Sequence, residues 1–194
     1  MKTQVRDQFI AEVNVGKASG DMHVSRISNL IATSTVQIVQ HSIYCAKASG
    51  GSTGITFTDA SDVKTTGINN FAQSKLPDNM LLLVTEIRLL GVELAATPTA
   101  ETIKGANYGS IKGLTGVQNG VIDIFSDGKI IVKDYPLSNF IVENNHNQEL
   151  GTITLGSPKF VFPGAEFKAE IRTGVNTNVN LVVKLELIGC ATLN

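Results

Sequence analysis

Cys45 and His41 are the first residues in the chain whose types could do chemistry together, because a histidine can activate a cysteine as a nucleophile. Both fall in the β-rich segment 36–45, and residues four apart on a strand share a face at about 13 Å. That distance is beyond hydrogen-bonding reach, so we expect Cys45 to be a buried core residue. We also expect no nucleophile elbow of the kind that carries a catalytic serine.

Metal binding would need histidine or carboxylate side chains at close spacing. The three histidines form no H-x-H or H-x-x-x-H pair: His23, His41 and His146. Three aspartates in predicted loops could supply oxygen ligands, although no D-x-D-x-D-G sequence supports a calcium loop: Asp59, Asp62 and Asp78. We therefore expect no metal site and no cofactor, and keep a calcium ion at these aspartates as an alternative.

Glu166 and Glu170 share the exposed face of one predicted strand with Lys168 and Arg172. Mixed charge on such a face is typical of solubility and of the protection of sheet edges. A glycosidase would need two carboxylates that converge in a cleft. We expect no catalytic residue here and predict that the protein is not an enzyme.

Phosphate and nucleic-acid binding are also poorly supported. Three glycines of the segment 95–120 recur every four residues, which is neither a P-loop nor a G-x-G-x-x-G sequence: Gly105, Gly109 and Gly113. Basic side chains gather at two places without forming a dense patch: Lys129 with Lys133, and Lys2 with Arg6. With 16 Lys and Arg against 17 Asp and Glu, we expect nucleic-acid contact at most from the N-terminal arm.

The elements that would position any site are predicted to be short strands. Ile and Val together outnumber Leu by more than two to one, and β-branched residues favour pleated sheets. Alternation or β-rich runs predict strands over 36–45, 55–57, 80–94, 121–125, 130–132, 138–142, 152–155, 160–162, 166–172 and 179–187. Gly91 is expected to bend or split the run 80–94, and Asp127-Gly128 predicts a type I′ hairpin turn.

Residues 1–34 are predicted to be an N-terminal arm with a short helix. Around Phe9 and Val13 the apolar spacing fits both a strand and a helix. Asp21 could cap a short helix that carries Val24, Ile27 and Ile31 on one face. The remaining residues, 35–194, are predicted to form one jelly-roll-like, all-β antiparallel sandwich of about eight strands.

Composition narrows the class of protein. Charged residues make up only 17%, below the roughly 25% of average domains. The chain has no Trp, which disfavours stacking on sugars or bases. The two cysteines, Cys45 and Cys190, are expected to be buried and reduced, with a bridge between them as the alternative. No apolar run is long enough for a membrane span, and we expect no secretion signal and folding in the cytoplasm of the host.

The chain resembles the single jelly-roll structural proteins of bacterial viruses. The resemblance lies in the run MLLLVTEIRLLGVEL after the turn LPDN, in FVFPGAEFKAEIRTG, and in the closing strand NVNLVVKLELIGC. It covers roughly residues 35–190 and rests on the pattern of strands. The resemblance implies a homo-oligomer, a trimer or a pentamer, that forms part of a capsid or decorates it, with other virion proteins as partners.

We therefore expect a non-enzymatic virion structural protein, located in the virus particle. The alternative is a β-sandwich binding module that recognises a glycan or a cell surface, as receptor-binding or adhesin domains do. Its site would lie in the loops 48–75 or 95–120, since loops on a rigid scaffold commonly hold binding sites.

Overall fold

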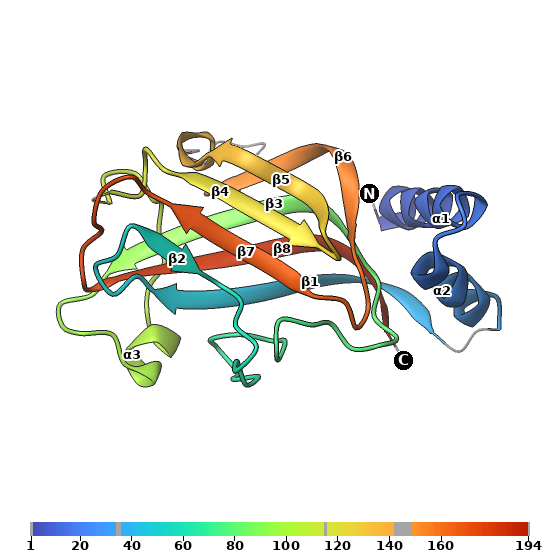
Figure 1. Ribbon diagram of the computed structural model, residues 1–194, viewed down its shortest axis with the longest axis horizontal. Coiled ribbons are helices and arrows are strands. Elements are labelled where there is room, and N and C mark those ends of the chain that lie inside the picture. Colours follow the sequence, from blue (N-terminus) through green and yellow to red (C-terminus); the bar gives the residue numbers. More distant parts are fainter. Residues whose placement is uncertain (1, 34–35, 115, 142–148, 194) are drawn as a thin grey trace.

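The computed structural model describes residues 2–33, 36–114, 116–141 and 149–193. Two four-stranded antiparallel sheets pack face to face, and two helices lie at one end of them (Figure 1). The all-β sandwich of about eight strands is thus confirmed. The elements are α1 (Lys2–Ala18), α2 (Met22–Ala32), β1 (Gln37–Ala48), β2 (Gly54–Thr56), β3 (Leu82–Glu93), α3 (Ala100–Lys104), β4 (Val121–Ser126), β5 (Lys129–Pro136), the 3₁₀ turn η1 (Leu137–Phe140), β6 (Thr152–Val161), β7 (Phe167–Arg172) and β8 (Leu181–Leu193).

The strands follow the jelly-roll order. The first sheet runs β1-β8-β3-β6 and the second runs β2-β7-β4-β5. The antiparallel pairs β1–β8, β2–β7, β3–β6 and β4–β5 are nested, as if one long hairpin had been rolled across both sheets. The last strand, β8, therefore lies inside the first sheet, between β1 and β3.

Alternation along the strands explains which side chains face the core between the sheets. In β7, Phe167, Ala169 and Ile171 are buried, while Lys168 and Arg172 are exposed. The hairpin between β4 and β5 also forms as predicted. Its turn has positive φ at both central residues, 52° at position 127 and 69° at position 128, as a type I′ turn requires.

The bend predicted at Gly91 is wrong. Strand β3 is continuous, and its register with both neighbours shifts between Val84 and Glu86 instead. At Gly91 the backbone exchanges two hydrogen bonds of 3.0 Å with Gly109, and a Cβ there would overlap the Leu114 side chain. A side chain at this position would force Leu114 to move, because a loop crosses close to the strand.

Two further predictions need correction, the division of 152–162 into two strands and the strand at 138–142. Segments 152–155 and 160–162 belong to one strand, β6, which bulges between them: Val84 pairs with Lys159 while Glu86 pairs with Thr154. The predicted strand 138–142 is instead the turn η1, up to residue 140, and residue 142 lies outside the described residues. Pro136 precedes this turn and has no N–H for continued pairing, while Leu137 and Phe140 are buried at a 3₁₀ spacing.

The N-terminal segment, in which the spacing left strand and helix open, forms α1 and α2. Asp21 caps α2 as predicted and accepts hydrogen bonds from the amides of His23 and Val24 at 3.0 and 3.2 Å. Both helices pack against the outer side of the first sheet and build a second apolar cluster, separate from the core between the sheets. Its buried members are Phe9, Val13, Val24, Ile27, Leu81, Leu83, Phe162 and Cys190.

A substitution at Gly189 tests how tightly β8 fits beside β3. A Cβ at this position would overlap the carbonyl oxygen of Leu83, so we expect Gly189→Ala to lower the free energy of unfolding by about 1–3 kcal/mol. Gly156→Ala is the matched control, because no heavy atom lies within 4 Å of a Cβ there. Urea denaturation of both variants measures the difference, and equal stability would contradict the fit described here.

Candidate functional site

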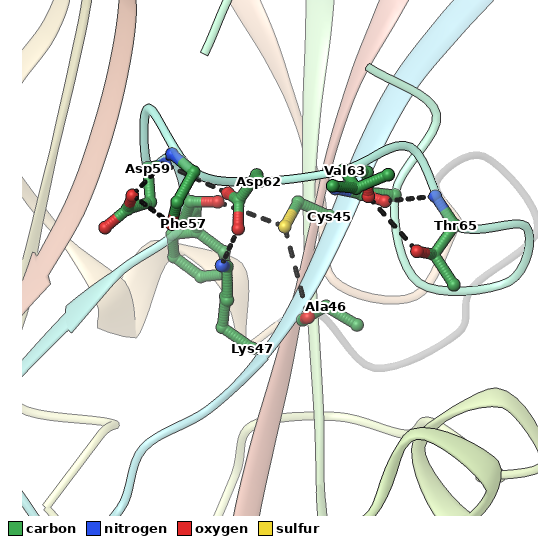
Figure 2. Close-up of polar contacts among 10 residues, drawn as sticks. Cys45, Ala46, Lys47, Phe57, Asp59, Asp62, Val63 and Thr65 are labelled. Carbon is green, nitrogen blue, oxygen red and sulfur yellow. Dashed lines mark hydrogen bonds and ion pairs between the residues drawn. The ribbon is translucent and has the colours of Figure 1, made fainter. Parts of the chain in front are cut away.

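Cys45 lies in the core between the sheets, close to the loop that follows β2 (Figure 2). Its Sγ donates a hydrogen bond to the carbonyl oxygen of Phe57 at 3.1 Å. Burial raises the pKa of the Cys45 thiol to about 12. A thiol with this pKa holds almost no thiolate at neutral pH, so Cys45 lacks the form that acts as a nucleophile.

The structure brings Cys45 together with neither partner considered for it. His41 stands four residues earlier on β1, and its pKa is lowered by burial and then by the positive charge of Lys64. Cys190 belongs to the cluster under the helices, on the opposite side of the first sheet from Cys45. Both thiols are free, so the alternative of a bridge is wrong.

Residues 50–54 spell G-x-S-x-G around Ser52, a match that the expectation of no nucleophile elbow overlooked. The structure places this segment between two strands, β1 and β2, whereas an elbow joins a strand to a helix. The Ser52 hydroxyl contacts the carbonyl oxygens of Ser49 and Gly54 at 2.7 and 2.5 Å. Ser52 thus acts as a turn residue here.

The loop aspartates are held by the protein itself. Asp62 accepts hydrogen bonds from Lys47 Nζ at 2.5 Å and from the amide of Asp59 at 2.9 Å (Figure 2). Asp59 binds the hydroxyl and amide of Ser61, and these bonds lower its pKa. Asp78 lies apart, beside Gly164. Within the described ranges no three His, Cys, Asp or Glu side chains are grouped to hold a metal, and His146 falls outside those ranges.

The carboxylates of Glu166 and Glu170 are not paired with each other. Glu170 pairs with the lysine between them at 3.3 Å. Arg172 donates to Asp123 and Asp134 at 2.7 and 2.6 Å across the outer face of the second sheet. The charges on this face therefore compensate one another, as expected for an exposed strand face.

The evenly spaced glycines serve three different backbone needs. Gly105 ends α3, Gly109 pairs with Gly91, and Gly113 has a φ of +78°. The helix in this segment, α3, precedes these glycines and the next element is the strand β4, so the glycines do not form a phosphate-binding loop that leads into a helix.

Lys129 connects the hairpin tip to the N-terminal helices. Its Nζ donates to Asp21 at 2.7 Å and lies 4.2 Å from the centre of the Phe162 ring. Burial acts to raise the pKa of Asp21, but the hydrogen bonds from Lys129, Val24 and His23 and the charge of Lys129 outweigh it, and the pKa is lowered. Of the other basic residues considered, Lys133 and Arg6 are exposed, and the side chain of Lys2 lies outside the described part.

A groove of about 270 Å³ lies beside this contact, between α1, the start of β5 and the bulge of β6. We call it the helix-end groove. Residues on its walls include Glu12, Val15, Asp21, Lys129, Ile130, Lys159 and Phe160. Val15 and Ile130 are 66% and 51% exposed, so the groove presents apolar side chains to the outside.

The opposite end of the molecule carries a second exposed apolar feature, on the connection between β7 and β8 (Figure 1). We call residues 173–180 the valine loop, because Val175 and Val179 are 59% and 60% exposed in it. The loop is anchored to the connection between β1 and β2: the amide and hydroxyl of Thr177 both donate to the carbonyl oxygen of Ser52, at 3.2 and 3.0 Å.

A third hollow, of about 410 Å³, is lined by the segment 70–78 together with Lys64 and Gly164. We call it the loop pocket. It overlaps one of the two loops in which a binding site was predicted. Two residues of its segment, Gln73 and Ser74, have positive φ of 53° and 56°, an uncommon conformation for residues other than glycine.

Sequence reasoning did not find the helix-end groove or the valine loop, and for the loop pocket it indicated only part of the segment, within 48–75. The helix-end groove joins residues 12 and 160, and no short motif reports so distant a contact. The one available signal was the presence of Val and Ile in otherwise polar segments, such as 173–180.

Asp21 provides a test of how the helices are attached. Asp21→Ala removes both the cap and the ion pair, and we expect a loss of about 0.5–2 kcal/mol in stability. Asp21→Asn keeps a capping side chain and should cost less than about 1 kcal/mol, since Lys129 is largely exposed. Exposed Asp7 supplies the control Asp7→Asn.

The Asp21 carboxylate also makes the stability of α2 depend on pH. Its folded-state pKa lies below the reference value of 3.8, so its contribution is complete above pH 3.8 and is lost as the pH falls through the folded pKa. We expect the protection of the α2 amides against hydrogen exchange to fall as the pH is lowered from 5 in the wild type and not in Asp21→Ala. The protection is the measured rate corrected for the pH dependence of the intrinsic exchange rate. An identical pH response in both would contradict the assignment.

Comparison with known proteins identifies no relative of the chain. No family model, no protein of curated function and no solved structure matches the chain. None of the helices in the described ranges has the length and apolar character needed to cross a membrane.

Proposed function

We propose that the protein is a non-enzymatic structural subunit of a bacterial virus, built into the capsid or attached to it, and that it acts by assembling with copies of itself. The observation that carries this proposal is the jelly-roll order of the eight strands. The architecture of the strands is thus the support for this proposal. The proposal also implies a location, the virus particle, and partners, which are further copies and other virion proteins.

The surface supplies support that is independent of the fold. Ion pairs compensate the charges on the outer sheet faces, as at Arg172 on one sheet and at Arg88 with Glu186 on the other. Apolar side chains are instead exposed at the two ends of the molecule. Exposed apolar patches mark contact sites, and a charge-poor chain with such ends is suited to association.

Light scattering on the size-exclusion peak at tens of micromolar tests this proposal, with negative-stain images of the same fraction. We expect a trimer, a pentamer or a closed particle. A protein that stays monomeric at this concentration and never enters particles would contradict it.

The second candidate function is a binding module for a glycan or a cell surface, and the loop pocket favours it. The pocket is bordered by Lys64 and Lys75, which are both exposed, and by the amide side chain of Gln73, over a floor that includes Phe71 and Leu76. A few polar groups around apolar side chains are typical of ligand sites, and two lysines against one carboxylate, that of Asp78, would favour an acidic sugar.

A glycan array that includes sialylated and sulfated saccharides tests this candidate. We expect any bound acidic glycan to lose at least about tenfold in affinity for the double variant Lys64→Ala, Lys75→Ala, equivalent to about 1.4 kcal/mol. Lys133→Ala, at an exposed lysine of β5, is the control. If the wild type binds no saccharide on the array, the proposal of a glycan-binding module is wrong.

A further inference from the structure

Large apolar side chains are exposed at both ends of the long axis of the protein. Among the described residues they are Val15, Met22, Ile130, Val175 and Val179, and the one other exposed large apolar side chain, Val63, lies in the loop after β2. Val15 and Ile130 border the helix-end groove, and Met22 follows Asp21 of its wall. Val175 and Val179 lie on the valine loop at the far end (Figure 1). Two different apolar surfaces therefore face away from each other.

The charges of the helix-end groove favour an uncharged occupant. Its walls carry two acidic and two basic side chains, Glu12 and Asp21 against Lys129 and Lys159. Asp21 and Lys129 already pair at 2.7 Å. The other two, Glu12 and Lys159, have opposite signs, so the walls give a group of either charge no net attraction to offset its loss of water.

The valine loop is uncharged, as this groove requires of its occupant. No charged residue occurs between Arg172 and Lys184, a stretch that contains the whole loop. The loop is also held in place, since Ser49 Oγ donates to the carbonyl oxygen of Asn178 at 2.8 Å and Leu181 donates to the same atom at 3.0 Å. An ordered loop loses little conformational entropy when it binds.

We propose that the valine loop of one copy docks in the helix-end groove of the next copy. The inference rests on the proposed function and names the contact through which copies assemble. A groove cannot fill a second groove of the same shape, so the two-fold pairing of like surfaces is disfavoured. Joining unlike surfaces is a heterologous contact, which gives a ring when the rotation closes and a filament when it does not.

Two variants that each disable one surface test the contact. Val15→Asp with Ile130→Asp disables the groove, and Val175→Asp with Val179→Asp disables the loop. We expect each variant alone to be monomeric, with the concentration for half-dissociation raised at least about tenfold. Mixed together they should form dimers of one copy of each and nothing larger, because a single intact groove then meets a single intact loop.

Native mass spectrometry with one variant ¹⁵N-labelled identifies the mixed dimer. Val63→Asp, at a valine 75% exposed in the loop after β2, is the control and should assemble like the wild type. Should an aspartate variant fail to fold by circular dichroism, Ile130→Thr and Val179→Ser replace it and should weaken assembly in the same pattern.

The outcomes separate this contact from the proposed function. A monomeric wild type overturns both. A wild-type oligomer that either variant leaves intact, or two monomeric variants that form no mixed dimer, overturns the loop-in-groove contact alone.

Discussion

The insertion of β8 between β1 and β3 is the constraint on which the rest of the structure depends. Its thirteen residues supply both neighbours of the first sheet with hydrogen bonds, and every one of these pairings joins distant parts of the chain. The fit is close, since Gly189 lies against the backbone of Leu83. Contacts of such high sequence separation cost loop entropy before they add stability, so formation of the first sheet is cooperative.

The side chains that stabilise the fold are distinct from those that form the helix-end groove. One apolar core lies between the sheets, and the second, smaller cluster lies between the first sheet and the helices. Among the side chains that the structure describes, none from α1 or α2 is buried in the core between the sheets. Their attachment combines this cluster with the contact of Asp21 and Lys129, and it creates the helix-end groove as a by-product of the junction.

The sequence predicted the parts of the fold that depend on local patterns. Alternation in β7, the Asp127-Gly128 turn and the Asp21 cap each report a short-range rule, and each is confirmed. The role of Gly91 and the bulge of β6 depend on what crosses or pairs with a strand, which no local pattern contains. The helix-end groove and the valine loop are still further from prediction, because the groove joins segments far apart in the chain and the loop is defined by its exposure.

The position of Cys190 in the cluster under the helices has a consequence for synthesis on the ribosome. The helices are translated before the platform that covers their apolar faces, and Cys190 of that platform follows the end of α2 by 158 residues. At bacterial and eukaryotic speeds of translation the wait is roughly 10–30 seconds. During that time the nascent helical pair has its final docking place incomplete, which makes it a natural substrate for chaperones that bind emerging apolar segments.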